Sequence, residues 1–139
     1  MGIYGSTGSF TLSGVVNTGA LATYTLEYRK VDVAGNIGTG SRSVVVRDTT
    51  APVVTRIGSG SIMVAQSGSY VEPGVSWTDN VDGSGTGGIT TSGSVDVFTP
   101  GVYTLDYTYV DTSSNTGNTV SRSITVYAPD VTPPVVTLV

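Results

Sequence analysis

The feature that most constrains the fold is an internal repeat. The motif Tyr24-Thr25-Leu26-Glu27-Tyr28 returns 79 residues later as Tyr103-Thr104-Leu105-Asp106-Tyr107. Both copies continue through a Val-Asp pair to an Asn and a Gly, and the match resumes at Ser41–Val44 and Ser121–Ile124. Tandem copies of a domain-sized unit fold largely unit by unit. Each unit is therefore expected to be a small domain of roughly 80 residues with one modest core.

Apolar and polar residues alternate within the repeated motif. Tyr103, Leu105 and Tyr107 alternate with Thr104 and Asp106, which is the period of a strand with one buried face. Short β-branched runs, separated by Gly, Pro, Asn and Asp turns, are also expected to be strands: Val44–Val46, Ile62–Val64, Val75–Trp77, Val95–Phe98 and Ile124–Val126. No segment has a helical period. About seven short strands with frequent turns predict an all-β, immunoglobulin-like antiparallel β-sandwich in tandem repeats.

The repeat also predicts the domain boundaries. Residues 49–130 form one complete unit, because a Pro-containing linker follows the last strand of each copy. Residues 1–48 match only the second half of a unit, and residues 131–139 are predicted to be a linker and the first strand of a following repeat. Apolar strands in the half-unit would then lack partners. Either the parent chain is longer, or another chain supplies the strands.

Composition excludes several classes of function. The chain has no Cys and no His, so disulfides, thiolate zinc sites and Ser-His-Asp triads are excluded. A net charge of −4 with six basic residues argues against nucleic acid as a partner. No apolar run approaches the ~20 residues that span a membrane. Met1–Phe10 lacks the basic start and apolar core of a secretion signal.

Residues 49–126 resemble one bacterial immunoglobulin-like family, whose repeats were named from a Cry-type pesticidal crystal protein and occur in tandem in secreted and surface proteins. Five motifs carry the resemblance, in the order and spacing of the family. They are Asp48-Thr49-Thr50-Ala51-Pro52-Val53-Val54-Thr55, Tyr70-Val71-Glu72-Pro73-Gly74-Val75, Thr78-Asp79-Asn80-Val81-Asp82-Gly83, Thr91-Ser92-Gly93-Ser94-Val95-Asp96 and Gly101-Val102-Tyr103-Thr104-Leu105-Asp106-Tyr107. The resemblance implies an immunoglobulin-like sandwich that serves as a spacer or adhesive module, and it implies no catalytic residues.

The sequence departs from the family pattern at two places. A Gly/Ser/Thr insert, Ser84–Gly88, stands where the family usually has an acidic residue. The family loop Asp-x-Ala-Gly-Asn is intact at Asp32–Asn36, whereas the complete unit has Asp111-Thr112-Ser113-Ser114-Asn115. The first departure weakens the case for a metal site in the complete unit.

Acidic turn residues of the complete unit are candidate calcium ligands. Asp79, Asp82 and Asp111, with Asn115, offer oxygen atoms from loops, and calcium takes six to eight such ligands. The spacing does not fit an EF-hand. Asp and Asn are also ordinary turn residues whose side chains bond to local backbone. Both interpretations remain open at this point, and a second calcium site at the junctions would use Asp48 and Asp130.

Three further positions have competing interpretations. Arg42 and Arg122 are equivalent in the repeat and share a face with Val44 and Ile124. We expect each arginine to pack its stem at the rim of the sandwich and to reach a carboxylate. Trp77 is expected in the core, and a sugar-stacking role is the alternative. Lys30, the only lysine, replaces the inward Tyr109 of the other copy.

These observations predict a non-enzymatic, extracellular or cell-surface structural module. It would space or display other domains, or support adhesion, with neighbouring immunoglobulin-like repeats as its partners. One alternative is a self-assembling fibre or surface-layer subunit, a homopolymer completed by strand donation between chains. Another is a carbohydrate-binding accessory module of a secreted enzyme. No cofactor is certain, with calcium the one candidate.

Overall fold

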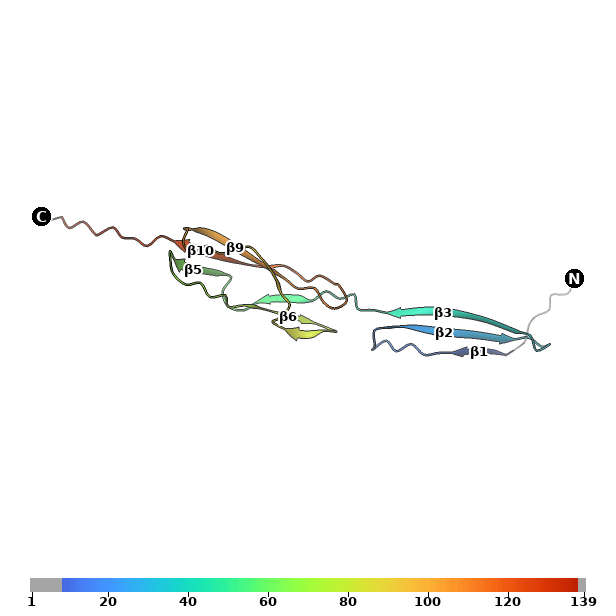
Figure 1. The fold of residues 1–139 in the computed structure, drawn as a ribbon. Helices are drawn as coiled ribbons and strands as arrows, with labels where there is room; N and C mark the ends of the chain where they lie inside the picture. Colours follow the sequence, from blue (N-terminus) through green and yellow to red (C-terminus); the bar gives the residue numbers. More distant parts are fainter. Residues whose placement is uncertain (1–8, 138–139) are drawn as a thin grey trace. The chain divides into compact units, whose positions relative to one another are not determined.

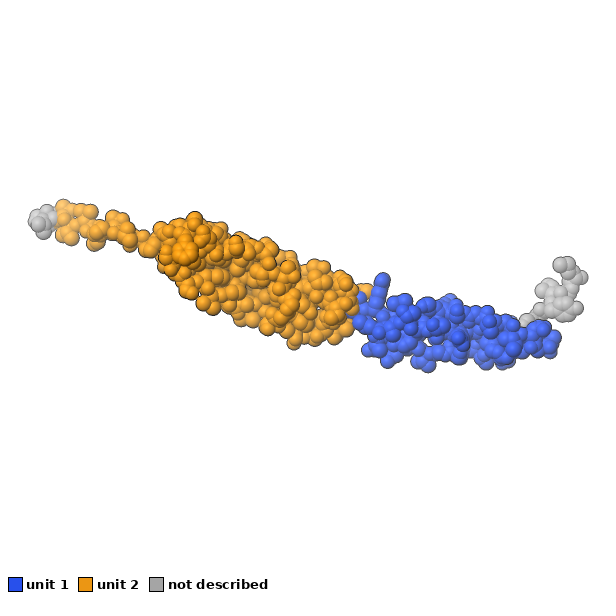
Figure 2. Space-filling model, in the orientation of Figure 1, with its two compact units in different colours: residues 1–48 blue, residues 49–139 orange. Residues whose placement is uncertain are grey.

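The computed structural model describes residues 9–137 and divides the chain into two compact units, Met1–Asp48 and Thr49–Val139 (Figures 1 and 2). The described residues form strands and no helix, which confirms the predicted all-β class. No described residue lies in a helix long and apolar enough to cross a membrane.

The second unit is a sandwich of two sheets. Its strands are β4 (Val53–Arg56), β5 (Ser61–Ala65), β6 (Val75–Asp79), β7 (Gly83–Gly85), β8 (Thr90–Ser92), β9 (Gly101–Thr108) and β10 (Val120–Tyr127). One sheet has the order β4–β6–β7 and the other the order β5–β10–β9–β8 (Figure 1). All pairings are antiparallel except that of β5 with β10, which is parallel. These strands of residues 49–137 confirm the predicted immunoglobulin-like β-sandwich.

Both sheets contribute side chains to one core. Its buried hydrophobic residues are Val54, Val64, Val75, Leu105, Tyr107 and Ile124. The alternation predicted for the repeated motif is present, since Val102 is 70% exposed and Tyr107 is 2% exposed on the same strand. Strands with a period of two thus bury one face and leave the other in water.

The first unit contains a single sheet. Its strands are β1 (Phe10–Ser13), β2 (Ala22–Val31) and β3 (Ile37–Val46), in the order β1–β2–β3, and both pairings are antiparallel. Among the described residues of this unit, only Asp48 is buried to the degree of the core residues of the second unit. The first unit is therefore a half-sandwich with no second sheet in residues 9–48.

The two units share their strand register. Leu26 pairs with Arg42 in the first unit, as Leu105 pairs with Arg122 in the second. The loops that follow β2 and β9 also match, because the N–H of Asp32 donates to the carbonyl of Asn36 just as Asp111 donates to Asn115. The sheet β1–β2–β3 is thus the structural counterpart of β8–β9–β10.

A charged side chain lies in the centre of the second unit. Arg122 is 0% exposed, and its Nε lies 3.0 Å from Oε1 of Glu72. Its two Nη atoms donate to three backbone carbonyls, those of Ile57, Ser59 and Gly74. All four partners belong to residues 57–74, the segment that includes β5 and leads into β6. The prediction that Arg122 reaches a carboxylate is confirmed, whereas the prediction that it packs at the rim is wrong, since the side chain is fully buried and these acceptors compensate for burying its charge.

Glu72 is in turn surrounded by donors. Its carboxylate accepts hydrogen bonds from the hydroxyl of Tyr107 at 2.6 Å, from the hydroxyl of Tyr70, and from the N–H of Gly74 at 2.9 Å. Burial by itself would raise the pKa of Glu72. The hydrogen bonds from Tyr107, Tyr70 and Gly74 and the charge of Arg122 outweigh that effect and hold the pKa below its ordinary value of 4.5. Glu72 is therefore ionised near neutral pH.

The predicted strand at Val95–Phe98 is wrong. This segment is a turn, because Asp96 accepts hydrogen bonds from the N–H of Phe98 at 2.9 Å and from the hydroxyl of Thr99 at 2.7 Å. Such local bonds compete with strand pairing. Val95 and Val97 still pack against the core, which explains the misleading pattern, whereas Phe98 is exposed.

Residues 131–137 belong to the predicted linker and first strand of a following repeat, and that assignment stays a prediction. This segment is not assigned to any strand, and Val135 is 90% exposed. A strand needs a neighbour for its backbone groups, and the described residues provide none here. Residues 138–139 lie outside the described residues. Residues 1–8, part of the segment Met1–Phe10 that lacks the features of a secretion signal, also lie outside them.

The ion pair between buried Arg122 and partly exposed Glu72 predicts how stability changes with pH. The pKa of Glu72 is lower in the folded than in the unfolded state, so its contribution is complete above about pH 4.5. That contribution is lost as the pH falls through the lower folded-state pKa. Glu72→Gln should lower the free energy of unfolding of the second unit by about 3 kcal/mol at pH 7, because Arg122 loses its counter-charge.

Urea unfolding followed by Trp77 fluorescence at pH 7 and pH 3 measures this effect. The gap between the parent chain and Glu72→Gln should shrink at pH 3, whereas Glu27→Gln, on an exposed residue of the first unit, should change little. An equal gap at both pH values would contradict a role for the ionised carboxylate.

Gly93 gives a second prediction. It has a φ of 92°, and a Cβ there would lie 2.2 Å from the carbonyl oxygen of Thr104. Gly93→Ala should destabilise the second unit by roughly 2–3 kcal/mol through backbone strain and this clash. Gly87→Ala is the matched control, because a Cβ at Gly87 meets nothing within 4 Å. Thermal unfolding that ranks the two variants equally would count against the described turn.

Candidate functional site

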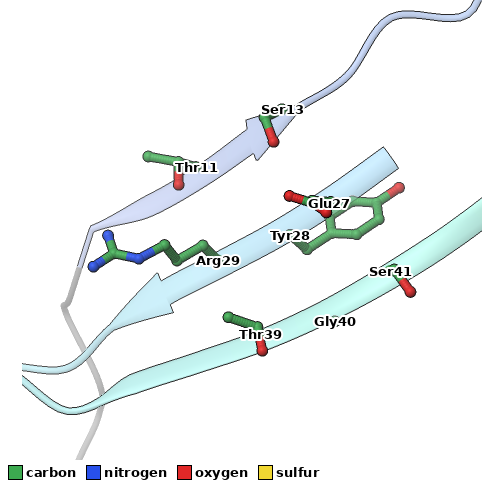
Figure 3. Close-up of a pocket in the computed structure, with 8 residues that line it drawn as sticks. All are labelled: Thr11, Ser13, Glu27, Tyr28, Arg29, Thr39, Gly40 and Ser41. Atoms are coloured by element: carbon green, nitrogen blue, oxygen red, sulfur yellow. The ribbon is translucent and has the colours of Figure 1, made fainter. Parts of the chain in front are cut away.

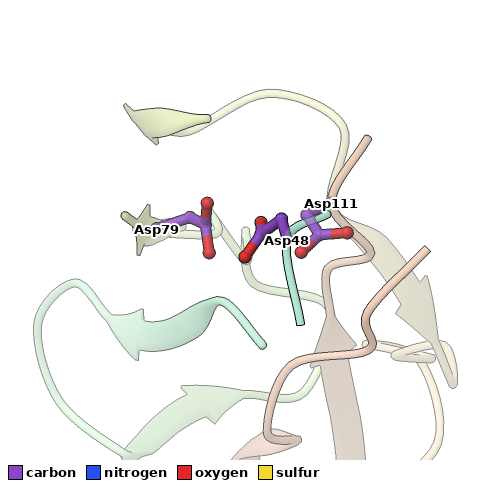
Figure 4. Close-up of side chains that lie close together, drawn as sticks. All are labelled: Asp48, Asp79 and Asp111. Carbon is purple, nitrogen blue, oxygen red and sulfur yellow. The ribbon is translucent and has the colours of Figure 1, made fainter. Parts of the chain in front are cut away.

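Two of the predicted calcium ligands lie close together in the second unit. Asp79 is the last residue of β6, and Asp111 lies in the loop closed by the bridge between Val110 and Thr116. One carboxylate oxygen of Asp79 lies within 4.8 Å of one of Asp111 (Figure 4). Asp111 is only 6% exposed. Two nearby carboxylates form an electronegative site that a hard cation could occupy.

The carboxylate oxygens of Asp79 and Asp111 differ in the hydrogen bonds that they accept. Oδ1 of Asp79 accepts hydrogen bonds from the N–H groups of Val81 at 2.8 Å and Asp82 at 2.9 Å. The bonds from Asp82 and then Val81 hold the pKa of Asp79 below its ordinary value, so the group is ionised. Its Oδ2 is buried and accepts no hydrogen bond from the described residues. Both oxygens of Asp111 accept hydrogen bonds from Asn115, at 2.7 and 2.8 Å.

The other two predicted ligands, Asp82 and Asn115, form hydrogen bonds that stabilise loops. Asp82 accepts hydrogen bonds from the N–H of Thr112 at 2.8 Å and from its hydroxyl at 2.6 Å, which ties the loop after β6 to the loop after β9. Asn115 donates its side-chain amide to Asp111. The bond of Asn115 to Asp111 is local and matches the turn interpretation, whereas the bonds of Asp82 join two separate loops. Calcium binding by Asp79, Asp82, Asp111 and Asn115 stays a prediction.

The junction residues differ in their surroundings. Asp48, also drawn in Figure 4, ends the first unit and is 7% exposed. Asp130 is exposed, and its Oδ1 accepts a hydrogen bond from the N–H of Thr132 at 2.8 Å. A calcium site at Asp48 and Asp130 also stays a prediction.

Trp77 lies in the position expected of a core residue. Its ring packs against the hydrophobic core and stacks on Tyr109, with ring centroids 4.1 Å apart and an interplanar angle of 6°. Its Nε1 donates to the carbonyl of Gly87 at 2.8 Å. One face of the indole is therefore already covered by an aromatic ring, which disfavours a role in stacking on a sugar.

The first unit presents an uncovered apolar face, which we call the inner face. It comprises the side chains of Phe10, Leu12, Tyr24, Leu26, Tyr28, Arg42, Val44 and Val46, placed on one side by the register of the sheet. Phe10 is 61% and Leu12 is 54% exposed. The guanidinium of Arg42 lies 6.0 Å from the centre of the Tyr28 ring, and Arg42 is exposed, unlike Arg122.

The opposite face of this sheet is polar and holds a shallow hollow (Figure 3). The side chains around the hollow are Thr11, Ser13, Glu27, Arg29, Thr39 and Ser41. Equivalent residues of the second unit, Asp106 and Ser121, simply bond to each other at 2.5 Å on the solvent side. The hollow therefore has the character of an ordinary solvated sheet surface, without the apolar walls of a ligand pocket.

Glu72 is the important residue to which the sequence assigned no role. It stands in the quoted motif at residues 70–75, yet nothing in that motif marks it as the partner of a residue 50 positions later. A usable signal was the inward parity of Arg122, because a buried guanidinium requires a carboxylate nearby.

Comparison with known proteins identifies a family and similar chains. The family model described as bacterial surface protein, Ig-like domain matches residues 54–126, more than half of the chain. The chain is 35% identical over 124 residues to an uncharacterized 81.3 kDa protein of Acholeplasma phage L2, and 36% identical over 118 residues to hyalin of Strongylocentrotus purpuratus. These matches cover 82% and 77% of this chain but only 16% and 9% of the two relatives.

The solved structures include a similar fold. A lipoprotein from Bacteroides thetaiotaomicron superposes with a TM-score of 0.52 and 29% sequence identity, over 60% of this chain and 41% of that one. The predicted resemblance to a bacterial surface immunoglobulin-like family is confirmed, since the family match spans a complete sandwich with the expected sheets. The chain belongs to the family of bacterial surface protein Ig-like domains.

Proposed function

We propose that this chain is a non-enzymatic spacer module of a surface or secreted protein, and that its complete unit carries mechanical tension. The family is one of bacterial surface proteins and is typically non-catalytic, and the similar solved structure is a lipoprotein. Both support a surface or extracellular location. Neighbouring immunoglobulin-like repeats are the expected partners, joined by short linkers that Pro52 and Pro133 stiffen.

The observation that carries the proposal is the parallel pairing of β5 with β10. Five residue pairs, from Ser61 with Ser123 to Ala65 with Tyr127, align the two strands. Hydrogen bonds extend this ladder at both ends, from the N–H of Ser123 to Gly60 at 2.9 Å and from the N–H of Gln66 to Tyr127 at 2.8 Å. β5 lies near the start of the unit, and β10 is its last strand.

This arrangement determines how tension acts on the hydrogen bonds. A pull on the two ends of the unit acts first on β4, and the tension that reaches β5 draws it toward its N-terminal end while β10 is drawn toward its C-terminal end. Because the strands are parallel, these opposite forces slide one strand along the other. The hydrogen bonds of the ladder are then loaded together, whereas strands that are peeled apart lose their bonds one at a time. Resistance to sliding is what a spacer under tension needs.

The surroundings of Trp77 and the open edge of β3 bear on the two alternative functions, carbohydrate binding and assembly by strand donation. Trp77 is stacked on Tyr109 and bonded to Gly87, so this indole is not a free aromatic platform for a sugar. Assembly by strand donation remains an alternative proposal, because β3 has only β2 as a neighbour among the described residues. Growth of the molar mass with concentration would support it.

Pulling experiments on single molecules test the proposed function. Gln66→Pro removes the N–H that donates to Tyr127 and should lower the unfolding force of the second unit. Gln66→Ala is the matched control, because it loses only the side-chain bond to the carbonyl of Phe98 and keeps the ladder. Forced unfolding reports the unfolding barrier, so force spectroscopy along the chain is the direct measurement. An unchanged force for Gln66→Pro would contradict the mechanical role of this ladder.

A further inference from the structure

We propose that the inner face of the first unit is a docking surface for a β-segment that carries a glutamate for Arg42. The segment is of the type seen at residues 53–85 of the second unit, which contains β4–β7. It would cover the apolar residues of the inner face and place its carboxylate against the guanidinium. This interaction surface is independent of the proposed mechanical function.

The second unit shows what such a segment does to an equivalent sheet. Ile124 and Val126 on β10 are 0% and 2% exposed beneath the opposing sheet. Their counterparts Val44 and Val46 on β3 are only half-buried. The backbone register is the same in both sheets, so the difference comes from the cover and not from the sheet itself. Burying such an apolar face is favourable by about 25 cal/mol per Å².

Charge complementarity specifies the chemistry of the partner. Arg122 is held by one carboxylate and three carbonyls, all from residues 57–74. Arg42 has the same strand partner as Arg122, a leucine, yet it lies exposed beside Tyr28. An apolar cover without an acid would bury this guanidinium without a counter-charge, which is costly. The partner segment must therefore present a carboxylate at the position of Glu72.

The edge of the sheet fits the same partner. In the second unit, β5 lies in the segment that holds Arg122 and pairs with the outer edge of β10. The corresponding edge of β3 is open among the described residues. One segment could thus add a parallel strand to β3 and supply the carboxylate that follows it, as residues 57–74 do for β10.

A second copy of the inner face is a poorer occupant. Two such faces packed against each other would bring Arg42 and Lys30 of both copies into one layer. Neither β1, β2 nor β3 places an acidic side chain on this face, because Glu27 belongs to the opposite one. Like charges buried together would repel each other. Lys30, which replaces Tyr109, also favours a partner with an acidic or aromatic residue at that end.

The inference is tested by fusing the first half of a repeat, which contains β4–β7, to the N-terminal side of the first unit. A second copy of residues 49–88 is joined directly before Phe10 in place of residues 1–9, since Gly88–Ile89 is the corresponding junction in the second unit. Hydrogen exchange of the β2 and β3 amides is measured, with the β9 and β10 amides of the same molecule reporting correct folding. We expect protection of β2 and β3 to rise by about 100-fold while the protein stays monomeric by light scattering.

A double-mutant cycle supplies the matched controls. Glu72→Gln in the added copy only, or Arg42→Gln, should each remove most of the gain, and the two together should remove little more. Equal gains with Glu and Gln in the added copy would overturn the role of charge. Unchanged protection of β2 and β3 with folded β9 and β10 would overturn docking itself. A parent chain that dimerises with protected β2 and β3 would show that a second copy is the occupant instead.

Discussion

The ion pair of Arg122 with Glu72 is the interaction on which the complete unit depends. It places a full charge in the centre of a small core, where only a carboxylate and several carbonyl groups can compensate for the lost hydration. Because Arg122 lies on β10 and its partners lie between β4 and β6, the pair connects the two sheets. Tyr107 and Tyr70 then fix the carboxylate through their hydroxyls. Removing Glu72 would leave the charge of Arg122 buried without its counter-charge, which is costly.

A comparison of the two units distinguishes the contribution of the repeated three-stranded sheet from that of the segment β4–β7, which covers it in the second unit only. Both have the same register, the same Asp-to-Asn loop and a glycine of positive φ after the first strand, Gly14 or Gly93. Local sequence is therefore enough to form the three-stranded sheet. Only the unit with β4–β7 buries its valines, tyrosine and arginine. The long-range partners, and not the repeated motif, create the core.

Much of the fold was predictable because its signals are local. The alternation at Tyr103–Tyr107, the turn residues and the repeat together predicted strands, sandwich and family. The inward parity of Arg122 was visible, but the identity of its partner Glu72 was not, since their contact joins residues 50 positions apart. Val95–Phe98 resembled a strand because Val95 and Val97 reach the core without strand pairing. Of the candidate metal ligands, the structure brings Asp79 and Asp111 together and uses Asp82 to bind Thr112.

The most direct test of this account compares the two sheets within one molecule. Native-state hydrogen exchange of the parent chain measures the opening free energy of β2 and β3 alongside that of β9 and β10. The account predicts that β9 and β10 amides exchange only through global unfolding of the second unit, while the equally paired amides of β2 and β3 exchange far faster. Similar protection in the two sheets would contradict it, because stability would then come from the repeated sheet and not from the covering sheet and the ion pair of Arg122 with Glu72.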